Sequence, residues 1–290
     1  MPTIRYTLAA FALAACGTDT TPPAGSNDYT LTGRSPYLEG FAVGATVRNL
    51  VLRAENRTGA MMNELRCGYS FMLFTASRAA AQTPTATGSG GDCRLYAAPP
   101  ERDYSGQNWL CAGAITTVSG DLNQTSGFCP AMNSAGPWEG NFRSCGAFLN
   151  TRTAAVSSMD EIGPDDRVTD LEGEVRFPTI PVISQPTTLA VITWPSTGDL
   201  SVAWNSLQAT SAMVRIEPDG AERTGPTIVC TPRVNGRLTI DAALINQSGL
   251  RAMNARLRVW SFRETTVQAE GHAWNLAGAA GSNVLLQPAR

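Results

Sequence analysis

The chain has 290 residues, of which 43% are hydrophobic and 16% are charged, so it is long enough for about two domains with apolar cores. Its formal net charge of −2 excludes the strongly basic surface that is typical of nucleic-acid-binding proteins. All 22 basic residues are arginine, and the lack of lysine excludes Schiff-base chemistry and a phosphate-binding P-loop lysine.

The amino terminus has the pattern of an export signal. Arg5 supplies a positive charge, and residues 8–15 form an apolar run that is too short to cross a bilayer. Residues 13–16 (LAAC) resemble the lipobox of bacterial lipoproteins. This resemblance implies cleavage before Cys16, lipid attachment to Cys16 and a membrane as partner through that lipid. The alternative is an ordinary signal peptide in which Cys16 is incidental.

A polar segment follows the signal. Residues 16–36 are rich in Thr, Pro, Gly and Ser and lack apolar periodicity, which predicts a flexible leash. Gly17 stands where lipoproteins retained at the inner membrane carry aspartate, so the resemblance implies the outer membrane.

Six further cysteines predict disulfide bonds, because an even number of cysteines in an exported chain is typical of a disulfide framework. None of them forms a C-x-x-C motif, which excludes a zinc ribbon. We expect a local pair between Cys129 and Cys145. Cys230 lies far from the other cysteines in the sequence. Either it forms a disulfide with a cysteine in the earlier part of the chain, or Cys230 and one earlier cysteine remain free thiols. The candidates are Cys67, Cys93, Cys111, Cys129, Cys145 and Cys230.

The pattern of apolar residues predicts an all-β fold. Residues 65–73 alternate between apolar and other side chains, as in a half-buried strand. Short β-prone runs separated by Gly, Pro, Ser, Asn and Asp favour a sandwich or barrel. They are residues 47–52, 93–96, 114–118, 189–194, 200–204 and 227–230.

The last third has the clearest local signals. Asn235-Gly236 predicts a two-residue hairpin between strands 227–233 and 237–240. Asp241 is expected to cap a short helix that stops at Gly249, and residues 257–262 and 283–286 to form later strands.

Residues 187–290 resemble the immunoglobulin-like β-sandwich modules of bacterial lipoproteins, through a strand ending in Trp (DLSVAW), one ending in Cys (TIVC) and a turn into LTIDAAL. Such modules bind ligands, act as spacers or present a surface, and the fold alone implies no reaction.

Three prolines, Pro178, Pro181 and Pro186, mark the expected domain boundary. The predicted organisation is a signal peptide (1–15), the leash (16–36), a disulfide-containing β domain (37–182) and an immunoglobulin-like sandwich (187–290). One continuous two-sheet domain is the alternative.

Motifs for catalysis or metal binding are weak. The chain has no G-x-S-x-G or H-E-x-x-H motif, and its single histidine, His272, is more simply explained as a surface or packed residue. An acidic segment, residues 160–174, could hold Ca²⁺ but lacks EF-hand spacing, so a solvated face is favoured and no cofactor is expected. The calcium candidates are Asp160, Asp165, Asp166 and Asp170.

Tryptophans suggest one contact surface. Trp194 and Trp204 lie on apolar strands and are expected in the core. Trp138 lies in a loop between Cys129 and Cys145 and is a candidate ligand contact, although packing within its own loop is the favoured interpretation.

Together these features predict a non-catalytic, lipid-anchored envelope protein with a structural, binding or display role, whose ligand is an unknown protein or glycan. The first alternative is a carbohydrate- or peptide-binding surface module, with or without Ca²⁺. The second is a carboxylate-dependent hydrolase, which would need two facing carboxyl groups in a cleft.

Overall fold

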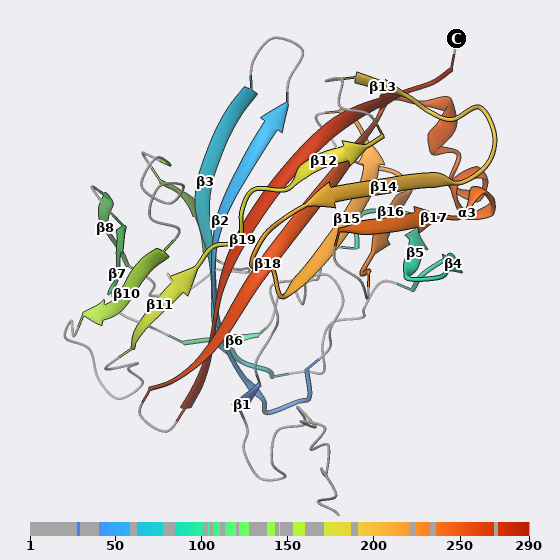
Figure 1. The fold of residues 1–290 in the computed structure, drawn as a ribbon. Helices are drawn as coiled ribbons and strands as arrows, with labels where there is room; N and C mark the ends of the chain where they lie inside the picture. The colour runs from blue at the N-terminus through green and yellow to red at the C-terminus, as the bar shows by residue number, and fades with distance from the viewer. Residues whose placement is uncertain are drawn as a thin grey trace, which may run out of the picture.

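The computed structural model describes residues 28–29, 41–58, 63–77, 85–100, 104, 107–110, 114–119, 122–127, 138–142, 145, 153–159, 171–186, 191–220, 224–232, 236–269 and 272–289. Strands dominate these residues, and the expectation of an all-β fold is confirmed (Figure 1). In the described part of the chain, no helix combines the length and apolar character that crossing a membrane requires.

A large sheet forms the centre of the molecule. Among the described residues it has 12 strands, in the order β4-β5-β16-β15-β18-β19-β2-β3-β6, with β1, β13 and β9 pairing beside β2, β19 and β3. The strands are β1 (Asp28–Tyr29), β2 (Thr46–Thr58), β3 (Asn63–Thr75), β4 (Gly88–Gly90), β5 (Cys93–Tyr96), β6 (Asn108–Trp109), β9 (Trp138–Asn141), β13 (Val191–Thr193), β15 (Ser211–Pro218), β16 (Thr227–Cys230), β18 (Ala255–Ala269) and β19 (His272–Gln287).

Two smaller sheets and one short helix complete the described structure. The four-stranded sheet, β11-β10-β7-β8, contains β7 (Ala114–Ser119), β8 (Leu122–Gly127), β10 (Thr153–Met159) and β11 (Glu172–Arg176). The three-stranded sheet, β12-β14-β17, contains β12 (Val182–Gln185), β14 (Leu200–Asn205) and β17 (Arg237–Ile240). Helix α3 (Ala242–Ser248) is followed by the 3₁₀ turn η1 (Leu250–Ala252).

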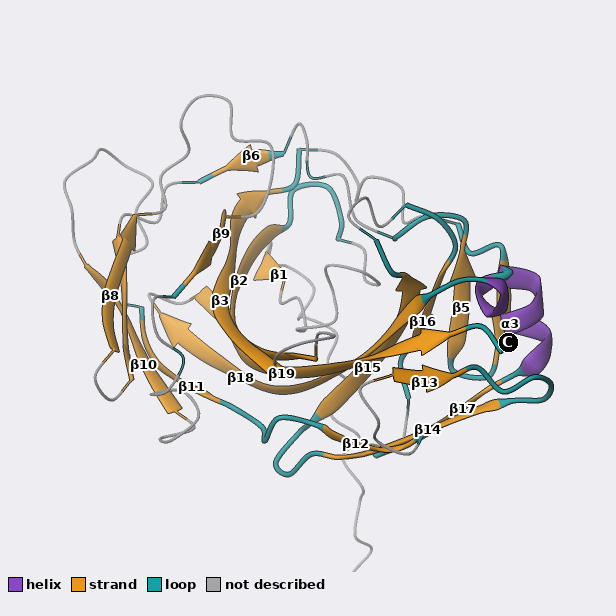
Figure 2. Cartoon of the chain, turned by 90° about the horizontal axis from the view of Figure 1, so that it is seen from above, coloured by secondary structure: helices purple, strands orange, loops and turns teal. Residues whose placement is uncertain are grey.

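The large sheet is curved, and both small sheets cover its convex face (Figure 2). Leu257 and Val259 of β18 pack in one core with Val202 and Trp204 of the three-stranded sheet. Farther along the same face, Leu276 of β19 packs in a second core with residues of the four-stranded sheet. The chain therefore has two sandwich-like regions on one shared sheet, held by burial of apolar side chains.

The expected domain boundary does not coincide with a break in the sheet. The early strand β2 pairs in parallel with β19, from Asn49 opposite Asn275 to Asn56 opposite Ser282. The early strand β5 pairs with β16. The residues before and after the expected boundary therefore contribute strands to the same sheet. The late strands β16 and β19 pair with the early strands β5 and β2.

Part of the expected leash is a strand. Asp28 and Tyr29 pair in parallel with Thr46 and Val47 of β2. The pairing of β19 with β2 begins only at Asn49, so the start of β2 has a free edge for these two residues. The predicted leash thus includes a two-residue strand, and the rest of residues 16–36 lies outside the described residues.

The predicted helix is confirmed, but its cap differs. Helix α3 ends at Gly249, whose φ of 71° is the left-handed conformation that favours glycine. Asp241 precedes the helix but makes no side-chain cap. Instead, the Ala242 backbone N–H donates to Asp199 Oδ1 at 2.8 Å, from the turn before β14.

The predicted hairpin around Asn235-Gly236 is wrong. Strand β16 pairs with β5 and β15, whereas β17 pairs with β14 in the other sheet. The chain passes here from one layer of the sandwich to the other. Gly236 has a φ of 99°, a conformation that glycine adopts readily, so the Asn-Gly pair suits this link as well as a hairpin turn.

Gly278 on β19 lies against the chain that leaves β11. A Cβ atom at this position would overlap the carbonyl oxygen of Arg176 and lie 3.0 Å from the Phe177 Cα. Because both neighbours are backbone, they cannot yield as a flexible side chain would. We expect Gly278→Ala to lower the free energy of unfolding by about 1–3 kcal/mol in urea denaturation.

Gly220→Ala is the matched control, since no atom lies within 4 Å of its added Cβ. Equal stabilities of the two variants would show that the close approach at Gly278 has no energetic consequence.

Candidate functional site

The concave face of the large sheet carries a set of charged and amide side chains that we name the charge network. Side chains alternate along β18, so Leu257 and Val259 point into the convex-side core while Arg256 and Arg258 point to the concave face. The network comprises Glu55 on β2, Arg215 and Glu217 on β15, Asp219 just after β15, Arg256 and Arg258 on β18, and Asn283 on β19.

Glu217 is the most buried acid of the network, at 1% exposure, and it lies between two arginines. Its Oε2 is 2.6 Å from Arg215 Nη2, and its Oε1 is 3.1 Å from Arg258 Nε. Arg215 and Arg258 face each other across β15 and β18, a pairing of like charges that is unfavourable by itself. Glu217 offsets this repulsion because it contacts both guanidinium groups.

The network continues across two further strands. Glu55 Oε1 lies 3.4 Å from Arg258 Nη1 and accepts a hydrogen bond of 3.4 Å from Asn283 Nδ2. Arg256 Nη1 donates to Asn283 Oδ1 at 2.7 Å, and its Nε and Nη2 donate to Asp219 Oδ1 at 2.9 and 2.8 Å. Strands β15, β18, β19 and β2 are thus joined by side chains as well as by their backbones.

The buried charges compensate one another. Arg215 and Arg258 are 7% and 9% exposed, and they are matched by Glu55 and Glu217 at 6% and 1%. Removing charges from water is costly unless they are paired and hydrogen-bonded. This arrangement can hold four strands in one register, because a slip of one residue would turn its members to the other face.

Other polar groups lie on the same face. Asn275 Nδ2 donates to the buried Asn49 Oδ1 at 3.0 Å, which links β19 to β2 at the far end of their pairing. Burial raises the pKa of Tyr96 on β5, and the positive charge of nearby Arg94 opposes this by lowering it. The Tyr96 hydroxyl therefore stays protonated at neutral pH.

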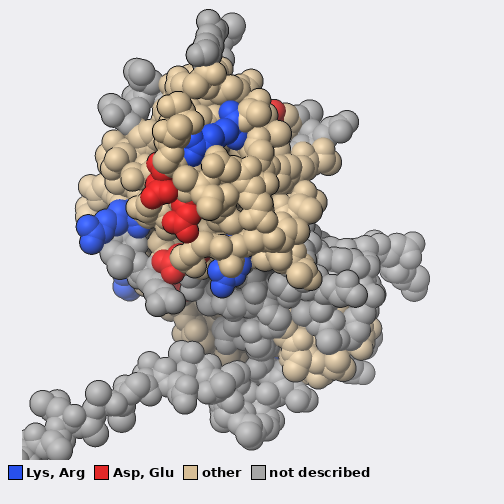
Figure 3. All heavy atoms as spheres, turned by 90° about the vertical axis from the view of Figure 1, so that its right-hand side faces the viewer, with Lys and Arg blue, Asp and Glu red and all other residues tan. Residues whose placement is uncertain are grey.

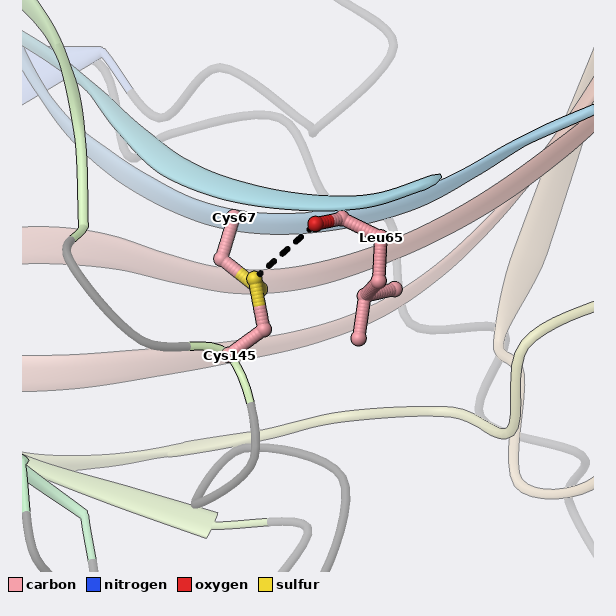
Figure 4. The surroundings of a disulfide bond; sticks show 3 residues. All are labelled: Leu65, Cys67 and Cys145. Carbon is pink, nitrogen blue, oxygen red and sulfur yellow. Dashed lines mark hydrogen bonds between the residues drawn. A yellow bond between two sulfur atoms is a disulfide. The ribbon is translucent and has the colours of Figure 1, made fainter. Parts of the chain in front are cut away.

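The disulfide Cys67–Cys145 joins β3 to a residue 78 positions later (Figure 4). The Cys145 sulfur lies 3.6 Å from the carbonyl oxygen of Leu65. A disulfide sulfur carries no proton, so we regard this as a contact rather than a hydrogen bond. The expected pair of Cys129 with Cys145 is wrong, because the chain folds back and places Cys145 beside β3 instead of leaving it within its own loop.

The disulfide Cys93–Cys230 joins β5 to β16 across 137 positions. The two residues face each other in the sheet and are fully buried. Cys230 is therefore bonded to the earlier part of the chain, one of the two outcomes that the sequence left open. Two disulfides in the described residues indicate an exported protein, because such bonds persist in oxidising compartments.

Several predicted site residues lie outside the described residues: Cys16, Cys111, Cys129, Asp160, Asp165, Asp166 and Asp170. Trp138 is the first residue of β9 and its backbone pairs with Phe71, but its side chain is not described. Among the described residues, no group of three or more His, Cys, Asp or Glu side chains is placed to hold a metal ion. His272 is exposed at the start of β19.

Sequence reasoning identified the tryptophan cores but not the charge network. Trp194 and Trp204 are buried as expected, at 2% and 4% exposure. A partial signal for the network was present on β15, where the charged pair Arg215 and Glu217 alternates with the apolar Val214 and Ile216. Its partners Glu55 and Asn283 come from distant strands, and no local pattern could have brought them together.

The end of the molecule formed by α3 and the β4–β5 hairpin carries charges of both signs, among them Asp92, Arg94 and Asp241. Uncharged side chains cover most of the described surface in this view, and a short group of acidic side chains lies between arginines (Figure 3). Gln247 Nε2 of α3 donates to the Thr87 carbonyl oxygen at 3.0 Å, so the helix contacts the chain that enters β4.

Comparison with known proteins gives little guidance. No family model matches the chain, and no curated protein matches it. Among solved structures, a crystal structure of chicken CNTN1 FN1-FN3 domains matches with 8% sequence identity, over 77% of this chain and 75% of that chain, at a TM-score of 0.20. A likeness at this level carries no argument about fold or function.

Proposed function

We propose that this chain is a lipid-anchored protein of the bacterial envelope with a non-catalytic structural, binding or display role. In this proposal, acyl chains on Cys16 hold the protein at the membrane, the polar segment after Cys16 spaces it from the lipid, and the disulfide-bonded β body presents its surface.

The non-catalytic role is supported by the charge network, whose buried acids contact other members of the network. Catalytic acids and bases need groups whose protonation suits a reaction and which can reach a substrate. In the network, Glu217 contacts two arginines, and Glu55 contacts Arg258 and Asn283. These charges connect four strands, and this supports a structural role for the most buried acids of the described residues.

The lipid anchor rests on the lipobox-like residues 13–16, and the disulfides support the exported compartment that such an anchor requires. Gly17 supports the outer membrane within the same resemblance. Several acyl chains would give stable attachment, whereas a single chain gives only marginal membrane binding.

Metabolic labelling with a fatty-acid probe in a bacterial host tests the anchor. We expect the wild-type chain to take up the label and to sediment with membranes, and Cys16→Ala to lose both properties, because the modified thiol is gone. Thr18→Ala is the matched control and should behave as the wild type. Labelling that survives in Cys16→Ala, or an unlabelled wild type, would overturn the lipoprotein proposal.

A further inference from the structure

The amino-terminal part of the chain joins the large sheet at one end. The two residues of β1 pair with Thr46 and Val47, where β2 begins. Phe41 packs at the same place, because its ring lies 5.2 Å from the ring of Phe74, and Phe74 is opposite Val47 in the sheet. These two contacts are independent, and both place the entry of the chain at the start of β2.

The long strands give the large sheet two well-separated ends. The near end contains β1, the start of β2 and the turn between β18 and β19, where Ala269 is opposite His272. The far end contains β13 and the last part of β19, where Thr193 is opposite Gln287. Figure 1 shows β1 and β13 at opposite ends of these strands. Strand β2 has 13 residues and leads away from the near end over about 40 Å.

The chain between the lipid site and the near end is short. Cys16 lies 12 residues before Asp28, the first residue of β1. A random-coil chain of 12 residues spans about 20 Å on average, and full extension gives at most about 40 Å. If Cys16 carries the lipid, as the proposed function holds, the near end must stay within this reach of the membrane. The far end has no such restraint.

We propose that the near end faces the membrane and that the far end is the surface that the protein presents. The body can transmit this orientation because its longest strands run without a break from one end to the other. Strands β18 and β19 pair continuously from Ala255 opposite Leu286 to Ala269 opposite His272. The charge network joins β15, β18, β19 and β2 by side chains as well. This inference rests on the lipid anchor of the proposed function and adds to it the side that meets the lipid.

Energy transfer from the protein to the bilayer tests the orientation. The full-length chain is purified from bacterial membranes and placed in phosphatidylethanolamine–phosphatidylglycerol vesicles that contain a lipid with an acceptor dye. Val43→Cys at the near end and Val191→Cys at the far end replace valines that are 63% and 36% exposed, and both take the same maleimide donor dye. His272→Cys is a second site at the near end. The wild type, treated in the same way, corrects for reaction of the native cysteines.

We expect the transfer efficiency from positions 43 and 272 to be at least about twofold higher than from position 191, because the two ends lie about 40 Å apart along the strands. Flotation with the vesicles and the intact mass of the chain report the lipid separately. Equal transfer from both ends, or higher transfer from position 191, in a lipidated chain that floats would overturn the orientation and leave the anchor standing. A chain without lipid on Cys16 would overturn both.

Discussion

Replacing Glu217 with glutamine should lower the free energy of unfolding by about 3–5 kcal/mol, the usual cost of removing one partner from a buried ion pair. Glutamine keeps the size of the side chain but removes the negative charge that contacts Arg215 and Arg258. The two arginines face each other across β15 and β18, and they would then repel each other in a site with little access to water. Urea denaturation, monitored by tryptophan fluorescence, measures this loss in the free energy of unfolding without adding salt.

Glu174→Gln provides the matched control for this experiment. Glu174 Oε1 lies 2.5 Å from Arg176 Nε, but these side chains are 49% and 53% exposed. Exposed ion pairs contribute about 0–1 kcal/mol, so the control should unfold almost as the wild type does. If both variants lost the same small amount, the charge network would have no special part in holding the sheet.

The strands that the sequence predicts best are those with strong local patterns. Residues 65–73 alternate clearly and lie within β3, and residues 93–96 coincide with β5. Helix α3 was expected from Asp241 before its start and from Gly249 at its end, and it lies between these two residues. Each of these signals comes from neighbouring residues, which is the range over which periodicity and turn preference act.

The central hairpin of β18 and β19 escaped prediction in its full length, since only residues 257–262 and 283–286 looked like strands. The middle of β19 is made of Ala and Gly, which have low strand propensity. The structure explains why small residues are needed there. Gly278 lies against the backbone at Arg176 and Phe177, and a Cβ at Gly281 would lie 2.7 Å from the ring of Trp260. Tertiary contacts outweigh propensity at these positions.

Long-range partners were the other limit of prediction. The sequence could show that Cys230 needs a distant partner, but Cys93 is 137 positions away and becomes its partner only through the pairing of β5 with β16. Glu55 meets Arg258 in the same way, through β2, β19 and β18. Contacts of this kind depend on the order of strands in the sheet, which local patterns do not encode.

The same long-range pairing leads to the largest expected effect. Residues 37–182, produced alone, should not fold, although the sequence suggests an independent domain. Within this fragment the described strands fall into three groups that no strand connects: β2, β3, β6 and β9; β4 and β5; and the four-stranded sheet. The strands that join them to the rest, β16, β18 and β19, all lie after residue 187, as does Cys230, the partner of Cys93.

The apolar cores also indicate that residues 37–182 should not fold alone. The core under the four-stranded sheet includes Trp274 and Leu276 of β19 and Ala269 of β18, with Val267 packed against it. Their loss would expose apolar surface on β2 and β3, at a cost of roughly 25 cal/mol for each Å². We expect the fragment to show no cooperative urea transition and a poorly dispersed amide NMR spectrum, whereas residues 28–290 should show both a transition and dispersion.

Co-expression distinguishes a fragment that lacks partners from one that is damaged. Residues 187–290 retain most of the core beneath the three-stranded sheet, so they can offer β16 and β19 as edges. When both fragments are made together in the exported compartment, we expect them to associate, with Cys93 bonded to Cys230 across the cut. A cooperative transition from residues 37–182 alone would show instead that the early strands form a domain of their own, and that the shared sheet joins two units that are each stable.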